Sequence, residues 1–140
     1  MKLILFYYFY STKSIFYDRR TDKYTQMTLS EICAAVAGTA VCGAGRLARE
    51  TDSAFASDLM SDVLTLKCEG FLLLTGLANV QAVRTAEMAD AACLLLCRGK
   101  KAGPEMIALA EEDGLAVIES PYSMFKCAGL LYAAGLEPVY

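Results

Sequence analysis

The sequence of 140 residues contains no histidine and no tryptophan. Without histidine it lacks the commonest general base, the Ser-His and Cys-His pairs, and the usual nitrogen ligand of zinc and copper. Its apolar runs, such as AACLLLC at 91–97, are far shorter than the ~20 residues of a membrane-spanning helix. These absences argue against His-based catalysis, against most zinc and copper sites and against a membrane protein.

No C-x-x-C pair occurs, although six cysteines are present. Cys93 and Cys97 are four residues apart in a strand-like segment, whereas zinc and iron–sulfur motifs need closer clusters on loops. Most of the six have Ala, Val or Leu neighbours, as buried thiols do. The pattern predicts reduced core cysteines in a cytosolic protein, and we expect neither a metal nor a cofactor. The six are Cys33, Cys42, Cys68, Cys93, Cys97 and Cys127.

Residues 1–26 differ in composition from the rest of the chain. They contain no Ala or Gly and hold 8 of the 14 aromatic residues, whereas residues 27–140 hold 21 Ala and 10 Gly. Their charge is +3, and that of residues 27–140 is −6. The first segment could be a signal peptide, an added edge strand, or a stretch translated from a start codon set too early. We favour the early start, because MTLSE from Met27 is a capping box that opens a helix.

From Met27 onward, short apolar strands alternate with helices. The predicted strands are residues 39–42, 53–57, 71–75, 92–97 and 115–119; the predicted helices begin at 28 and within 55–64, and cover 79–90, 104–114 and 122–135. Asn79 caps one of these helices, and Pro104 begins another. This alternation predicts one three-layer α/β/α domain with a mostly parallel sheet covered on both faces.

Two Ser-Asp pairs mark the stretch FASDLMSDVL at 55–64. Ser57 or Asp58 would fall at a helix N-cap, with Asp62 one turn further along the same face. Capping alone is one interpretation, a ligand-contacting turn is another, and a Mg²⁺ site formed by the two carboxylates is a third.

Several loops leave strands at the predicted carboxyl edge of the sheet, where ligands usually bind. TGLANVQ at 75–81 offers backbone N–H groups to an anion, and RGKKAGPE at 98–105 is a basic loop. GAGRLA at 43–48 matches the loose glycine pattern of a dinucleotide site, but the next predicted strand follows too soon to leave room for the helix that such a site needs. We expect an anion-binding site with no nucleophile–base pair, formed by Ser57, Asp58, Thr75, Gly76, Asn79, Arg98, Lys100, Ser120 and Tyr122.

The chain resembles the small stand-alone DRTGG-domain proteins, which are similar to the N-terminal domain of HPr kinase/phosphorylase. The resemblance covers 27–140 and rests on MTLSEI, FASDLMSDVL, FLLLTGLANVQAVRTAEMADA, RGKK and YSMFKCAGLLYAAGL. The pentapeptide DRTGG itself is absent, and TGLANVQ takes the place of its loop. The kinase half with its phosphate loop is also absent, so the resemblance implies a regulatory domain without kinase activity.

The resemblance further implies a cytoplasmic bacterial protein that regulates redox or energy metabolism. We expect it to bind a nucleotide or other small anion and no nucleic acid or membrane, and self-association is compatible with a small apolar domain. The alternative is an adapter for a hydrogenase or NADH-oxidising complex, with an exposed apolar face formed by Met124, Phe125 and Leu131.

Overall fold

The computed structural model describes residues 25–140, so the expectations for residues 1–24 lie outside the described residues. A six-stranded sheet in the order β2-β7-β6-β5-β4-β8 forms the centre. The strands are β2 (Thr39–Cys42), β4 (Ser53–Ala56), β5 (Leu72–Thr75), β6 (Cys93–Leu96), β7 (Ala116–Glu119) and β8 (Glu137–Pro138). All neighbours pair in parallel except β2, which runs antiparallel to β7.

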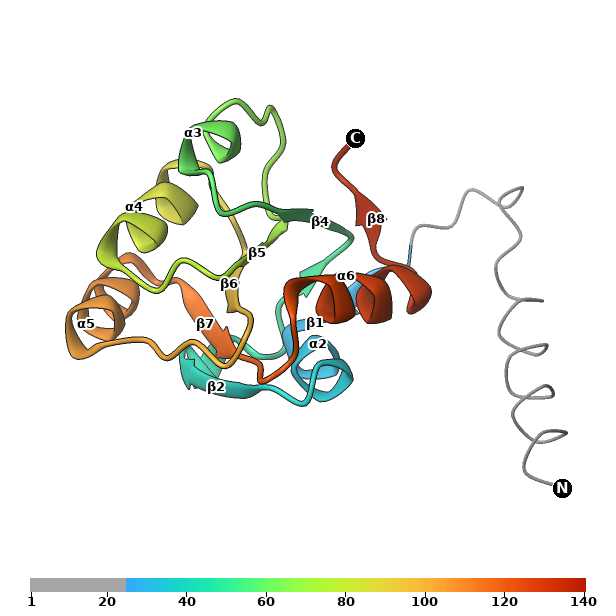
Figure 1. Cartoon of the computed structure of the whole chain (residues 1–140), viewed down its shortest axis with the longest axis horizontal. Helices are drawn as coiled ribbons and strands as arrows, with labels where there is room; N and C mark the ends of the chain where they lie inside the picture. Colours follow the sequence, from blue (N-terminus) through green and yellow to red (C-terminus); the bar gives the residue numbers. More distant parts are fainter. Residues whose placement is uncertain (1–24) are drawn as a thin grey trace, which may run out of the picture.

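Helices cover both faces of this sheet (Figure 1). On one face lie α3 (Met60–Val63), α4 (Val80–Met88) and α5 (Pro104–Asp113), and on the other lie α2 (Leu29–Ala35) and α6 (Met124–Ala133). Alternate residues of the central strands point to opposite layers: Leu73 packs with the first helix group, and Leu72 and Leu74 pack with the second. The prediction of a three-layer α/β/α domain with a mostly parallel sheet is confirmed.

Burial on both faces explains why the strands are nearly continuous apolar runs. All four residues of β5, β6 and β7 are buried, including Thr75 and Glu119 at the carboxyl ends of their strands. Such strands have no solvated face, so they lack the alternation of polar and apolar residues that half-exposed strands show. The two buried polar residues therefore stand out, and both lie at the edge where the site was expected.

The predicted capping signals occur where the sequence placed them. The Thr28 side chain accepts from the Glu31 N–H at 3.1 Å, and a Glu31 carboxylate oxygen accepts from the Thr28 N–H at 2.8 Å. Asn79 caps α4 through the Ala82 N–H, and Gly114 ends α5 in the left-handed conformation. The signals at the starts of α2 and α4 and at the end of α5 were thus correctly predicted.

Three short strands and the true length of α3 were not predicted. β1 (Met27–Thr28) pairs with β3 (Glu50–Thr51) as a separate two-stranded ribbon, and β8 adds a parallel edge to β4. Strands of two residues carry no periodicity, so the sequence offers no signal for them. The helix predicted from the two Ser-Asp pairs is a single turn, α3, whose N-cap is Leu59. The capping interpretation of Ser57 and Asp58 is therefore wrong for that helix.

The expectation of core cysteines holds for four of the six thiols: Cys42, Cys93, Cys97 and Cys127 are buried. Cys33 and Cys68 are half-buried, and all six cysteines are free thiols. Burial raises the pKa of Cys42 to about 11 and that of Cys97 to about 12, because an apolar interior disfavours the thiolate. Among residues 25–140 no group of His, Cys, Asp and Glu could hold a metal ion, and no helix is long and apolar enough to cross a membrane.

These environments predict a selective alkylation pattern. At neutral pH iodoacetamide should modify Cys33 and Cys68 of the native protein first, because the thiolate is the reactive form and reagent access is required. Peptide mass spectrometry after timed quenching measures the order, and urea-unfolded protein provides the control in which all six react. Early modification of Cys93 or Cys97 in native protein would contradict the burial described above.

Candidate functional site

The parallel strands β4, β5, β6 and β7 bring four loop starts to one edge of the sheet (Figure 1). Asp58, Gly76, Arg98 and Ser120 each follow one of these strands within two residues. Neighbouring parallel strands lie roughly 4.8 Å apart, so side chains from successive strand ends can contact each other directly. The edge predicted from the sequence therefore exists.

Asp58 is the centre of this edge. One of its carboxylate oxygens accepts from the Thr75 hydroxyl at 2.9 Å and from the Gly76 N–H at 2.6 Å. The other accepts from the Arg98 guanidinium at 3.2 Å. The pKa of Asp58 is lowered, chiefly by the Gly76 N–H and then by the Thr75 hydroxyl and the Arg98 charge. One carboxylate thus ties together the ends of three adjacent strands.

Arg98 adopts an unusual backbone conformation at this point. Its φ of 64° lies in the left-handed region that non-glycine residues seldom occupy, and Gly99 follows with a φ of 67°. The Arg98 N–H donates to the Tyr122 carbonyl at 2.7 Å, and the Gly99 N–H to the Ser120 carbonyl at 3.0 Å. Strain of this kind costs on the order of 1 kcal/mol and often accompanies functional sites. Here it accompanies a turn that sends the guanidinium back over the end of β5.

Gly76 makes room for that guanidinium. A Cβ atom added at Gly76 would collide with Nη2, Nε and Cζ of Arg98. The absence of a side chain at this position therefore lets the Arg98 guanidinium lie against the backbone of the loop. The glycine was predicted from the sequence as part of an anion site, and the structure gives it a steric role.

The basic loop after β6 carries less unpaired charge than its sequence suggests. Arg98 pairs with Asp58, and the Lys101 ammonium lies 3.0 Å from a Glu119 carboxylate oxygen. The other Glu119 oxygen accepts from the Ala102 N–H at 2.7 Å, so this largely buried carboxylate anchors the loop. Lys100 is exposed and forms no ion pair with any residue in 25–140. It is the cation of this loop most available to a ligand.

The remaining predicted residues divide between structural and open positions. The Asn79 side chain is committed to capping α4, and the N–H groups of Ala78, Asn79 and Val80 donate to no other described residue. The buried Ser120 hydroxyl donates to the Val36 carbonyl at 2.7 Å and accepts from the Tyr122 N–H at 3.1 Å. These bonds tie the end of β7 to α2 and leave the Ser120 hydroxyl in a structural role. The donors at this edge that remain open are therefore the N–H groups at the start of α4.

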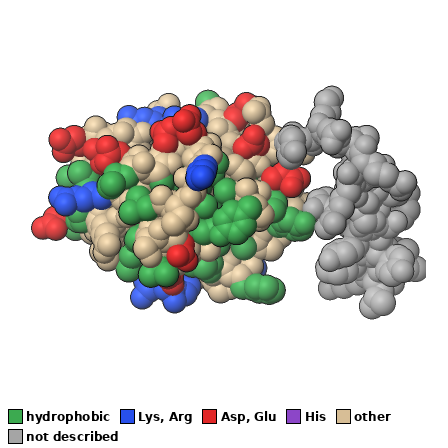
Figure 2. Space-filling model, turned by 90° about the horizontal axis from the view of Figure 1, so that it is seen from above, with side chains coloured by type: hydrophobic (Ala, Val, Ile, Leu, Met, Phe, Trp, Pro, Cys, Tyr) green, Lys and Arg blue, Asp and Glu red, His purple; other side chains and the backbone are tan. Residues whose placement is uncertain are grey.

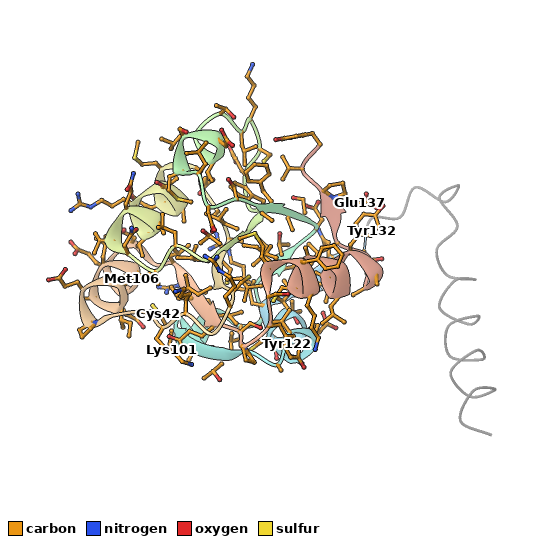
Figure 3. All side chains as sticks on the ribbon, viewed as in Figure 1. Cys42, Lys101, Met106, Tyr122, Tyr132 and Glu137 are labelled. Carbon is orange, nitrogen blue, oxygen red and sulfur yellow. The ribbon has the colours of Figure 1, made fainter. Side chains whose placement is uncertain are left out.

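Ser57 and Tyr122, both predicted at this edge, form local contacts. Ser57 closes its own turn, because its Oγ accepts from the Leu59 N–H at 3.0 Å. The half-buried Tyr122 ring is covered by the Lys126 ammonium, which lies 3.5 Å from the ring centroid. Figure 3 shows Tyr122 and Lys101 on the same lower edge of the molecule. Glu119 was not predicted as a site residue. The sequence nevertheless held a signal for it, because it is an acidic residue at the end of a predicted strand and the chain also has a basic loop.

The geometry defines a three-layer α/β domain with a polar cluster at the carboxyl edge of its parallel sheet. The DRTGG domain model matches residues 31–134, so the chain belongs to the DRTGG domain family. Comparison with curated proteins found no match.

This fold is found in solved structures, among them the following one. It comprises the CBS and DRTGG domains of the regulatory region of Clostridium perfringens pyrophosphatase, complexed with its activator diadenosine tetraphosphate. The TM-score is 0.62 at 17% sequence identity, over 80% of this chain and 48% of that one. The described chain therefore spans about half of that regulatory region, and the likeness establishes a shared fold.

The Asp58 cluster predicts a specific pH dependence of stability. Because the pKa of Asp58 is lower in the folded state, its contribution is complete above the unfolded pKa of about 3.9 and is lost as the pH falls through the folded pKa. Asp58→Asn should lower the free energy of unfolding at pH 7 by about 1 kcal/mol, a modest value because both partners of the ion pair are about half exposed.

Urea unfolding at pH 7 and in the acid range below the ordinary aspartate pKa measures this effect. The difference between wild type and Asp58→Asn should shrink toward zero at the lower pH. Asp62→Asn is the matched control, because Asp62 is exposed and lacks these partners. A difference that stays constant with pH would show that the Asp58 charge contributes nothing.

Proposed function

We propose that this protein is a non-enzymatic regulatory module that binds a small anionic ligand, such as a nucleotide, at the carboxyl edge of its sheet. The observation that carries the proposal is the placement of Arg98. A strained backbone, a carboxylate partner and a glycine all serve to hold its guanidinium at the end of β5. Pre-organised cations of this kind bind phosphate or carboxylate groups with little loss of side-chain entropy.

The surrounding donors suit the same ligand. The N–H groups of Ala78, Asn79 and Val80 are uncommitted and lie at the positive end of α4. Lys100 supplies an exposed cation two residues after Arg98. An anion placed between these groups would be neutralised from two sides, and Ser57 and Asp58 could accept from hydroxyl groups of the ligand.

The negative charge of Asp58 limits where the anionic part can bind. Its carboxylate already occupies the Gly76 N–H and the Thr75 hydroxyl, so a ligand phosphate would be repelled from these donors. We therefore infer that the anion lies on the Lys100 and α4 side of Arg98, with its hydroxyl-bearing part toward Asp58. This polarity distinguishes a nucleotide or sugar phosphate from inorganic phosphate.

A catalytic role is not proposed for this cluster. The Thr75 hydroxyl contacts a carboxylate, but Thr75 is fully buried and its oxygen also accepts from the Leu77 N–H at 3.1 Å. The lowered pKa of Asp58 makes it a weak base. Both features favour a structural tie over a nucleophile–base pair, which supports a binding module rather than an enzyme.

The pyrophosphatase regulatory region binds a dinucleotide activator, and a nucleotide ligand here would be of the same chemical class. From the sequence resemblance we also propose a relationship to the N-terminal domain of HPr kinase/phosphorylase, a cytoplasmic location, and a link to redox or energy metabolism. We propose that the family domain starts at Met27, where β1 begins.

Removing the two ligand-facing cations should weaken binding. A thermal-shift screen of the full chain with ATP, diadenosine tetraphosphate, acetyl phosphate and NADH, with and without Mg²⁺, identifies a stabilising ligand. At 100 times its dissociation constant such a ligand adds about 2.7 kcal/mol, a rise in Tm of several degrees. Arg98→Ala/Lys100→Ala should cut the affinity for that ligand at least tenfold, about 1.4 kcal/mol.

The control removes the same charge elsewhere. Arg49→Ala/Lys67→Ala deletes two exposed cations close to the starts of β4 and β5, at the opposite edge of the sheet, and should leave the shift unchanged. A ligand that binds equally well to the wild type and to both double variants would contradict the assignment of Arg98 and Lys100 to the binding site. A folded protein that no member of the panel stabilises would count against the small-anion function itself.

Gly76→Ala separates position from charge. The new Cβ would displace the Arg98 guanidinium while keeping the charge on the chain, and the displaced atoms are the far end of a flexible side chain. We expect folding to be retained and affinity for the ligand found in the screen to fall severalfold. Isothermal titration calorimetry measures the change, and unaltered affinity would mean that the guanidinium position is irrelevant.

The adapter function remains the second candidate because α6 exposes apolar surface. Of the three residues expected there, Phe125 is 89% exposed, Met124 is half-buried and Leu131 is buried. The face therefore exists, but it is formed by different neighbours of Phe125 than the sequence suggested.

A further inference from the structure

An apolar groove of about 460 Å³ runs between α6 and the β4–β8 edge of the sheet. Residues of β4, of α6 and of the chain after β8 form its walls, among them Ala56, Phe125 and Tyr140. Figure 3 shows Tyr132 on α6 and Glu137 on β8, which both line the groove, close to each other. The volume lies within the roughly 300–1,000 Å³ of small-molecule sites, so the groove is large enough to hold a ligand.

Two aromatic rings stand at this groove with their faces uncovered. Phe125 on α6 is 89% exposed, and Tyr140, after β8, is 88% exposed. The Tyr140 ring lies 5.8 Å from the Phe55 ring, centroid to centroid, so these two rings form an aromatic wall. Seen from above, Figure 2 shows hydrophobic side chains gathered in the middle of the face that carries the C-terminus, with charged side chains around them. Exposed aromatic rings of this kind are surfaces on which a flat ring system stacks.

Position 129 keeps the groove open one helical turn after Phe125. A Cβ at Gly129 would meet no atom within 4 Å, so the space beside this turn of α6 is empty. A ring that stacks on Phe125 therefore has room to extend along the helix.

The groove continues the row of site residues across the sheet. In the strand order β6-β5-β4-β8, the loops after the first three strands carry Arg98, Gly76 and Asp58. The groove follows next in this order, between β4 and β8 on the α6 side. Neighbouring strands are roughly 4.8 Å apart, so the row from Arg98 to the groove covers two to three strand spacings, about 10–15 Å. One extended small molecule can reach along such a row.

Both walls of the groove begin at the Asp58 cluster. Ala56 lines the groove and precedes Asp58 by two residues, which is at most about 7 Å of chain. Phe125 follows Tyr122 by three residues, and the Tyr122 carbonyl accepts from the Arg98 N–H at 2.7 Å. The mouth of the groove and the polar cluster therefore lie at the same edge of the sheet.

We propose that this groove holds the aromatic ring of the ligand whose anionic group binds Arg98 and Lys100, which makes that ligand a nucleotide. The inference rests on the proposed function and adds to it a site for the base. Along the edge, cationic donors come first, the Asp58 carboxylate second and the aromatic groove third. This is the order of phosphate, sugar hydroxyls and base in a nucleotide.

Charge fixes the orientation of such a ligand. Glu137 carries the only charged side chain among the described residues that line the groove, and its carboxylate repels a phosphate group. A carboxylate accepts hydrogen bonds, so it is compatible with the N–H donors of a base. The charge of −6 on residues 27–140 opposes acidic occupants in general, whereas an uncharged ring meets no such repulsion. The ring therefore belongs in the groove and the phosphate outside it.

The test compares two probes that carry the same phosphate and ribose. These are AMP and methyl ribofuranoside 5-phosphate, in which a methoxy group replaces the adenine, and each is titrated into the ¹⁵N-labelled full chain and followed by NMR. AMP should bind at least tenfold more tightly, about 1.4 kcal/mol. It should shift the amide signals of Phe125, Gly129 and Tyr140 together with those of Arg98 and Lys100, whereas the probe without a base should shift only the signals around the last two.

Two substitutions in the groove should remove the advantage of AMP. Phe125→Ala should lower the affinity for AMP about tenfold, as expected for the loss of one base–aromatic stack, and leave that for the other probe unchanged. Gly129→Leu should act in the same way by filling the groove, without a clash inside its own chain. Met88→Ala is the matched control, because it also removes an apolar side chain, 71% exposed, but from α4 in the opposite layer. It should change neither affinity, and circular dichroism checks that each variant is folded.

The outcomes separate this inference from the proposed function. Equal affinity for the two probes, or AMP binding that tolerates Phe125→Ala and Gly129→Leu, would overturn the inference and leave the anion site standing; the groove would then belong to another occupant, such as a partner protein. AMP that binds Arg98→Ala/Lys100→Ala as tightly as the wild type would also overturn it, because the groove would then act apart from the anion site. A chain that binds neither probe overturns the inference as well, and the proposed function is then decided by the other anions of the thermal-shift screen.

Discussion

The parallel pairing of β4, β5, β6 and β7 is the constraint on which the other features of this molecule depend. It requires a crossover between successive strands, and these crossovers put α3, α4 and α5 on one face, while α2 and α6 cover the other. It also gathers the carboxyl ends of the strands at one edge, so that Asp58 can bond to residues 17 to 40 positions away. The polar cluster is a consequence of chain topology, and no local sequence motif produces it.

Topology also explains which parts of the site could be predicted. The position of each strand end was readable from an apolar run and the turn residues after it, so Asp58, Thr75, Gly76 and Arg98 were correctly expected at one edge. The partner of each side chain was not readable, because pairing depends on strand order. One interpretation of the sequence made Ser57 or Asp58 a helix cap, but the main contacts of Asp58 are with the next two strands. Glu119 was not predicted as a site residue, because it ends an apolar strand.

The fold shows the same division between local and non-local information. The capping box at Thr28 and the helix start at Pro104 depend on neighbouring residues, and both were predicted. β8 depends on the return of residues 137–138 to β4, which follows from the packing of α6 and leaves no trace in a two-residue sequence. The apolar groove beside β8 was hidden for the same reason, although Phe125 itself was expected on an exposed face.

Charge pairing along the carboxyl edge shows how the site differs from a simple basic patch. Two of the three cations in the loop after β6 are neutralised by carboxylates at other strand ends, and each pair also fixes a backbone segment. A ligand bound at this edge, as we propose, would meet one uncommitted lysine and an arginine held in place by Asp58. Such an edge would favour a ligand that carries both an anionic group and hydroxyl groups over a bare anion, because Asp58 would repel a bare anion but could accept hydrogen bonds from hydroxyls.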